Sequence, residues 1–209
     1  MLILQGDDAL HSAVRLLPIV FTLVFGCVAG GIALAKVGFY SPFYIVGTSL
    51  GLIGSSLLYV VKLDTHAANL YGYSILVGLG TGLFVQAGFS VAQAKVPPQQ
   101  LGAATGFIAL GQLIGPTIAL SVAGTVLINT ATSGLEKLFP DIPITEIKNA
   151  IAGTAGQLLA TLDPASRTAA LEVIVHSISK VYILAITAMA VSFVCSALLR
   201  HERIVIQLG

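Results

Sequence analysis

Three glutamines, Gln86, Gln93 and Gln112, are the side chains best suited to do chemistry inside the long apolar stretches of this sequence. An amide without a hydrogen-bond partner is costly in an apolar environment, so each should face the protein interior or a cavity and not lipid. For Gln93, near the end of its stretch, we prefer a hydrogen bond between helices. For the deeper Gln86 we prefer a cavity, and for Gln112 both interpretations stay open.

Gln86 lies on a helix face that carries small, polar and aromatic residues together. At about 100° per residue, a helix over this region places small, amide and aromatic residues on one face, namely Tyr71, Gly78, Gly82, Gln86, Phe89 and Gln93. We therefore take Gln86, Phe89 and Gln112 as candidates for lining a substrate cavity.

Acidic residues and histidines are absent from the apolar stretches. His11, His66, His176 and His201 are scattered over the connecting segments, so a metal site would need distant residues to converge. No carboxylate or imidazole is placed for acid–base catalysis or a proton relay within the stretches. We predict no enzyme activity, no metal site and no cofactor.

The composition indicates that the solvent of this chain is a lipid bilayer. The chain is 56% hydrophobic and 9% charged, with a mean hydropathy of +0.96, whereas soluble domains carry about 25% charged residues. The net charge of +1 gives no field that would attract nucleic acid. We expect a lipid partner and no nucleic-acid partner.

Five stretches are long enough to span a bilayer, which takes about 20 residues of apolar helix. They cover residues 14–35, 43–61, 70–94, 102–128 and 180–199. The first four, within residues 14–128, are joined by short polar or proline-containing connectors that predict hairpins between antiparallel helices. The fold class is therefore all-α, a polytopic transmembrane helix bundle with about five spans.

Residues 129–179 form the one sizeable polar region. Ile144, Ile147 and Ile151 recur at helical spacing, which predicts an amphipathic helix on the outer surface. Asp163-Pro164 is typical of a helix start, and this second helix would continue into the last span. We prefer a packing role for this loop over a binding role.

Small residues four apart mark packing seams between membrane helices, because backbones can approach closely there. Every span carries one: Thr22/Gly26/Gly30, Gly47/Gly51/Ser55, Gly78/Gly82, Gly111/Gly115/Ala119 and Ala188/Ser192/Ser196. Pro116 follows Gly115 and removes one backbone hydrogen bond, which favours a kink. A tightly packed bundle is expected.

Basic residues set the expected orientation, since Lys and Arg near the ends of spans stay cytoplasmic. Lys36, Lys95, Arg200 and Arg203 fall on one side, and the short connectors lean towards placing that side in the cytoplasm. Residues 129–179 would then be extracellular and residues 200–209 a cytoplasmic tail.

Several motifs resemble the second half of fungal major facilitator superfamily transporters, in the branch of fourteen-span drug:proton antiporters. They are Leu4-Gln5-Gly6 with Ser12 to Pro18, Gly31 to Phe43, Gly78 to Leu83 with Gln86, Gln93 and Pro97, and Gln112, Gly115 and Ser121. The resemblance covers residues 4–203 and would make the five spans the last five of fourteen. Residues 1–13 would be the end of a preceding helix and an outer loop, and the N-terminal transporter domain would be missing.

The resemblance also implies a cytoplasmic loop motif, of which Gly31, Lys36 and Gly38 match, with Lys36 securing a gate. The acidic residue that precedes the basic one in the family is replaced here by Ala35. This copy of the motif therefore lacks its ion-pairing carboxylate.

The resemblance implies efflux of small organic compounds or toxins by proton-coupled alternating access, usually in the plasma membrane. Titratable groups for the coupling would lie in the missing domain. The alternative is a noncatalytic membrane scaffold that binds other membrane proteins through its small-residue seams.

Overall fold

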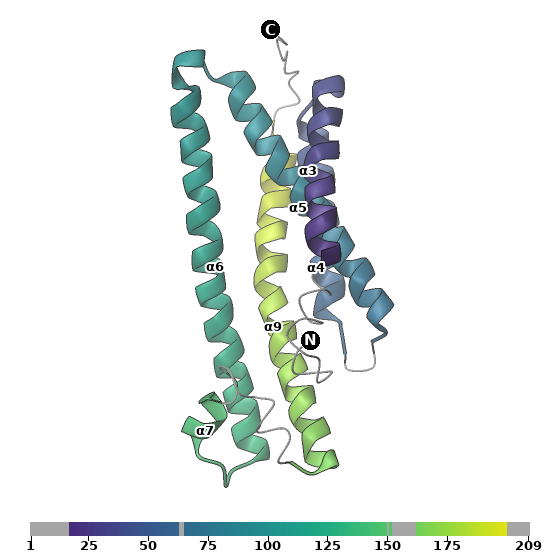
Figure 1. Cartoon of the computed structure of the whole chain (residues 1–209), viewed down its shortest axis with the longest axis vertical. Coiled ribbons are helices and arrows are strands. Elements are labelled where there is room, and N and C mark those ends of the chain that lie inside the picture. Colours follow the sequence, from purple (N-terminus) through teal and green to yellow (C-terminus); the bar gives the residue numbers. More distant parts are fainter. Residues whose placement is uncertain (1–16, 63–64, 150, 152–161, 200–209) are drawn as a thin grey trace.

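The computed structural model describes residues 17–62, 65–149, 151 and 162–199, and the regular elements in these residues are all helical (Figure 1). Five helices are long and apolar enough to cross a membrane. They are α3 (Leu17–Val37), α4 (Ser41–Tyr59), α5 (Ala67–Lys95), α6 (Leu101–Leu138) and α9 (Pro164–Ala197), with η1 (Pro98–Gln100) and α7 (Ile144–Asn149) as short additions. The all-α prediction is confirmed, and each predicted span overlaps one long helix.

Parts of the sequence-based predictions fall outside the described residues. These are the expected helix end and outer loop at 1–13, the tail at 200–209, and the part of the predicted loop at residues 150 and 152–161.

Glycines bring α5 into backbone contact with α3 and α4. A Cβ atom on Gly80 would lie 2.5 Å from the amide nitrogen of Gly51, and one on Gly78 would lie 2.8 Å from the carbonyl oxygen of Ile19. No side chain fits at such distances, so only glycine permits these helices to approach this closely. The seams predicted in α4 and α5 are thus interfaces within the chain.

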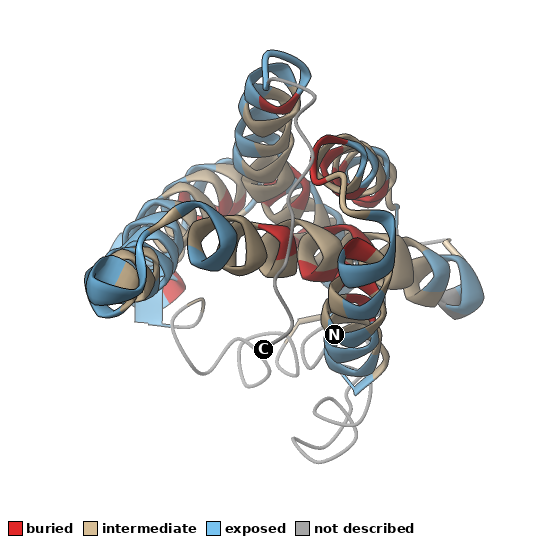
Figure 2. Cartoon of the chain, turned by 90° about the horizontal axis from the view of Figure 1, so that it is seen from above, coloured by how far each residue is buried: buried red, intermediate tan, exposed pale blue. Residues whose placement is uncertain are grey.

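The side chains inside the bundle are mostly small, several of them polar, whereas those on its outer surface are bulky and apolar. The buried residues of α4 are mostly small: Ser41, Gly47, Thr48, Gly51, Gly54, Ser55 and Leu58. By contrast, Phe21 is 76% exposed and Phe107 79% exposed. Figure 2 shows the buried positions turned towards the other helices and the exposed ones turned outwards. This distribution is the one expected when hydrocarbon surrounds the helices.

The last helix, α9, completes the bundle on the other side of α4. A Cβ atom on Gly51 would lie 2.9 Å from the sulfur of Met189. Gly51 thus lies between the backbone of α5 and a flexible side chain of α9, and the four helices pack in the order α3, α5, α4, α9.

Helix α6 stands largely apart from this bundle (Figure 1). Its 38 residues correspond to about 57 Å at 1.5 Å per residue, and it runs through Pro116 without interruption. It meets α9 near its C-terminal end, where Gly134 lies directly against the side chain of Val173. Residues 109–122 of α6 are all exposed.

The C-terminal end of α6, α7 and the start of α9 share a small core of their own. Leu135, Ile147, Ala170 and Ile174 form its buried cluster. Both long helices therefore extend past the predicted spans: α6 continues beyond residue 128 and ends before Pro140, which disfavours helix in the residue before it. The helix start predicted at Asp163-Pro164 is confirmed, since the Asp163 carboxylate accepts a hydrogen bond from the Ser166 amide at 3.4 Å.

Candidate functional site

Gln112 lies in the middle of the exposed part of α6. At about 100° per residue, it shares one helix face with Thr105, Ile108, Gly115, Pro116 and Ala119, whereas Phe107, Leu110 and Ile114 lie on the opposite face. The Gln112 face thus carries mostly small residues beside the amide, with Ile108 as its bulky member, whereas the opposite face is bulky and apolar apart from Thr117 and Ser121. Hydrocarbon suits the second face far better than the first.

The polar side chains of α6 differ in how their hydrogen bonds are satisfied. Thr117 donates to the carbonyl oxygen of Leu113 at 2.7 Å, and Ser121 donates to that of Thr117 at 2.9 Å. These hydroxyls are satisfied within the helix and tolerate lipid. The Gln112 amide has no hydrogen-bond partner among the described residues, so it needs one from elsewhere.

Pro116 adds a second polar group at the same position. In a helix the amide at position i donates to the carbonyl at i−4, and proline has no amide hydrogen. The main-chain carbonyl of Gln112 therefore lacks its helical donor. Position 112 presents both a side-chain amide and this main-chain oxygen, and neither group is stable against hydrocarbon.

Gln112 and Gln86 lie at similar depths. Gln112 is about 17 Å along α6 from the turn that joins it to α5, and Gln86 is about 14 Å along α5 from the same turn. In a hydrocarbon layer about 30 Å thick, both positions are near the midplane. The two helices diverge from the shared turn (Figure 1).

Gln86 is half-buried and faces α3. A Cβ atom on Gly31 would lie 3.3 Å from the Nε2 atom of Gln86, so the amide covers this glycine of the loop motif. Gly78 and Gly82, on the same side of α5, also face α3. Phe89, one turn further along α5, is half-buried.

The other loop-motif residues end α3. Gly38 has a φ of 71° and its amide donates to the carbonyl oxygen of Leu34 at 2.9 Å, which is the left-handed helix end that glycine favours. Lys36 is exposed in the last turn of α3, where a cation interacts favourably with the helix dipole.

An aromatic cluster at the same end of the bundle was missed by the sequence analysis. The Tyr40 and Tyr44 rings pack edge to face with centroids 6.3 Å apart, and Tyr44 packs on Phe84 of α5 at 5.5 Å. The ammonium group of Lys95 lies 5.9 Å from the centroid of Tyr40, within cation–π range. The cluster could have been predicted from the spacing of Tyr40 and Tyr44, which lie one helical turn apart in the sequence.

Among the described residues, no group of three or more His, Cys, Asp or Glu side chains could hold a metal ion. Cys27 and Cys195 are free thiols.

This chain is similar to known fungal proteins over nearly its whole length. It is 42% identical over 200 residues to "MFS-type transporter pgmG" of Aspergillus terreus, a match that covers 96% of this chain and 36% of the relative. It is 41% identical to "Efflux pump alnA" of Emericella nidulans, covering 97% and 37% respectively. It is also 40% identical to "MFS-type transporter patC" of Penicillium expansum, covering 95% and 37%. The chain matches no known family profile and no solved structure.

These similarities show that the chain is homologous to fungal MFS-type transporters, as the sequence motifs suggested. It spans slightly more than a third of the length of the curated relatives it matches. Together with the five apolar helices, the homology identifies an integral membrane protein.

Proposed function

We propose that this chain is part of an efflux transporter that moves small organic compounds by proton-coupled alternating access. In this role the chain supplies one wall of the substrate pathway, and an N-terminal transporter domain supplies the opposite wall together with the titratable groups for coupling. The membrane is the plasma membrane, with the C-terminus in the cytoplasm.

Position 112 is the observation that carries this proposal. Its side-chain amide and its main-chain carbonyl, which lacks a helical donor because of Pro116, lie near the midplane on a helix face of mostly small residues. Substrate sites of secondary transporters lie near the midplane, where interrupted helices expose backbone carbonyls. Gln86 and Phe89 are the candidates on α5, and Lys36 is the candidate for securing the cytoplasmic gate.

The scaffold alternative receives no support from the relatives. They are named as transporters and efflux pumps, and one is named for a phomenoic acid biosynthesis cluster.

The experiment is a transport assay in a full-length relative, with Gln112→Leu introduced at the aligned position. Loss of one hydrogen bond to substrate should lower efflux about tenfold, corresponding to about 1.4 kcal/mol. Gln112→Asn, which keeps the amide, should retain more activity than Gln112→Leu. Leu110→Ile on the opposite face is the matched control. Unchanged efflux of every substrate in both glutamine variants would refute the assignment.

A further inference from the structure

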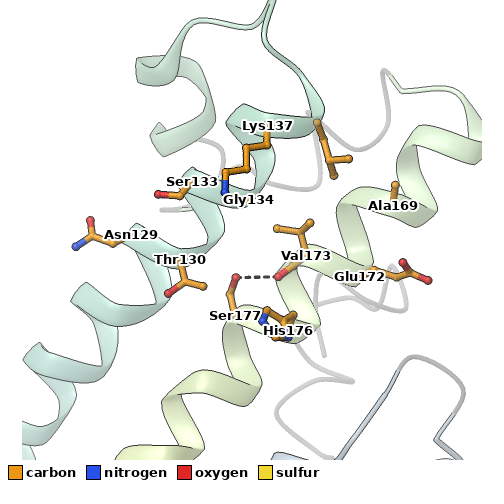
Figure 3. A pocket seen from close by; sticks show the side chains of 11 residues that line it. Asn129, Thr130, Ser133, Gly134, Lys137, Ala169, Glu172, Val173, His176 and Ser177 are labelled. Atoms are coloured by element: carbon orange, nitrogen blue, oxygen red, sulfur yellow. Dashed lines mark hydrogen bonds between the residues drawn. The ribbon is translucent and has the colours of Figure 1, made fainter.

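A groove between the C-terminal part of α6 and the N-terminal part of α9 has no role in the transport proposal. It is an open groove with a volume of about 720 Å³, within the range of about 300–1,000 Å³ typical of small-molecule sites. Its base is the contact between Gly134 and Val173. Figure 3 shows the lining side chains arising from the two facing helices.

The groove lies outside the hydrocarbon layer. Asn129 is about 42 Å and Lys137 about 54 Å along α6 from its start, and Ser177 is about 30 Å along α9 from its end. The hydrocarbon core is only about 30 Å thick. In this placement the groove lies on the aqueous side of the bilayer.

The lining is rich in hydrogen-bonding groups. Asn129, Thr130 and Ser133 lie along α6, one turn or less apart, and their side chains have no hydrogen-bond partner among the described residues. Ser177, on α9, is instead satisfied by the carbonyl oxygen of Val173 at 2.8 Å. Val173 and Leu138 supply apolar surface beside the polar row.

The charges of the groove favour an anion. The Lys137 side chain lines the groove and extends back along α6 in Figure 3. The one lining carboxylate, that of Glu172, points away from α6 in the same view. His176 is the remaining titratable side chain of the lining. A carboxylate beside Lys137 would gain a charge-assisted hydrogen bond.

We propose that this groove binds small organic carboxylates on the extramembrane side, with the carboxylate on Lys137, hydrogen-bonding groups on Asn129, Thr130 and Ser133, and an apolar body on Val173. Binding here is an equilibrium property of the chain and does not depend on transport. Failure of the transport assay above would therefore leave this proposal standing, and the reverse also holds.

The test uses the full chain in neutral phosphatidylcholine nanodiscs and follows the ¹⁹F resonance of 4-fluorobenzoate. Broadening beyond that seen with empty nanodiscs is expected, and the neutral 4-fluorobenzamide should not broaden. Lys137→Met should weaken binding at least tenfold, and Lys137→Arg should preserve it. Lys148→Met, at an exposed lysine of α7 outside the groove, is the matched control and should bind as the unaltered chain does.

The proposal is overturned if the unaltered chain causes no broadening, if the acid and the amide broaden equally, or if Lys137→Met and Lys148→Met lose binding equally. A lipid headgroup is the other source of an anion at this distance from the membrane midplane. Nanodiscs containing phosphatidylserine distinguish the two, since clear competition by this lipid would make a headgroup the occupant and contradict a site for soluble acids.

Discussion

At the residue scale, Pro116 determines which polar groups position 112 presents to its surroundings. Thr117 and Ser121 satisfy their hydroxyls within α6, but the Gln112 carbonyl has lost its helical donor to Pro116. In water such a carbonyl would simply be solvated. In hydrocarbon it needs a partner, so the proline turns an ordinary glutamine into a two-group polar site.

Pro116→Ala tests this directly, because alanine restores the amide hydrogen that can donate to the Gln112 carbonyl. The expected result is a lower amide I frequency for an isotope-labelled Gln112 carbonyl, measured by infrared spectroscopy in nanodiscs. The helix should also gain stability, up to about 3 kcal/mol. An unchanged frequency would mean that the carbonyl already has a donor in the parent chain.

Asp163 provides a prediction on pH. The hydrogen bond from Ser166 holds the pKa of its carboxyl below the usual value, so the ionised form favours the folded helix start. This stabilisation is present above the unfolded-state pKa and is lost as the pH falls through the lower, folded-state value. The protection factor of the Ser166 amide, which compares its exchange rate with the intrinsic rate at the same pH, should therefore fall in acid, and Asp163→Asn should show a flatter pH response. Identical profiles would argue against the cap.

At the scale of elements, the same sequence signal has two structural outcomes. The small-residue seams of α4 and α5 become backbone contacts, whereas Gly111 and Gly115 of α6 have no neighbouring atom within 4 Å of a built Cβ. The spacing of glycines predicts that a face is suited to close packing, but not what packs there. That depends on a partner, which for α6 lies outside the described contacts.

A pair of glycine substitutions separates the two cases. Gly80→Ala places a methyl group against the backbone of α4 and should destabilise the bundle by about 1–3 kcal/mol. Gly111→Ala meets open space and should be neutral or stabilising, by up to about 1 kcal/mol. Thermal unfolding of both variants in the same detergent measures the difference. Equal effects would show that α4 and α5 are not in backbone contact at Gly80.

Much of the fold followed from composition and spacing. Five apolar runs predicted five helices, and Asp163-Pro164 predicted the start of α9, because hydrophobic length and capping are local properties. The length of α6 past residue 128 was missed, since its continuation rests on the distant cluster of Leu135, Ile147 and Ile174. For the site, the sequence singled out Gln112 and Pro116 separately; the satisfied hydroxyls beside them became evident only with the hydrogen bonds in hand.

At the scale of the whole molecule, four helices form a bundle and α6 stands beside it (Figure 1). In the proposed full transporter, the N-terminal domain would face the side of α6 that carries Gln112. The extramembrane ends of α6 and α9 would then project on the face opposite to Lys36 and Lys95.

Orientation can be measured at this scale. In a chain whose Cys27 and Cys195 are replaced by alanine, Lys148→Cys should react with an impermeant thiol reagent added outside intact cells. Lys36→Cys should react only after the membrane is permeabilised. The reverse pattern would place the C-terminus outside.

The most direct test of the account is the water accessibility of position 112. In a cysteine-free full-length relative, a cysteine at the position aligned with Gln112 should react with a charged methanethiosulfonate reagent, and transported substrate should slow the reaction. A cysteine at the position aligned with Leu110, on the opposite face, should stay unreactive. If position 112 is unreactive, or if both positions react alike, the Gln112 face of α6 does not line a transport pathway.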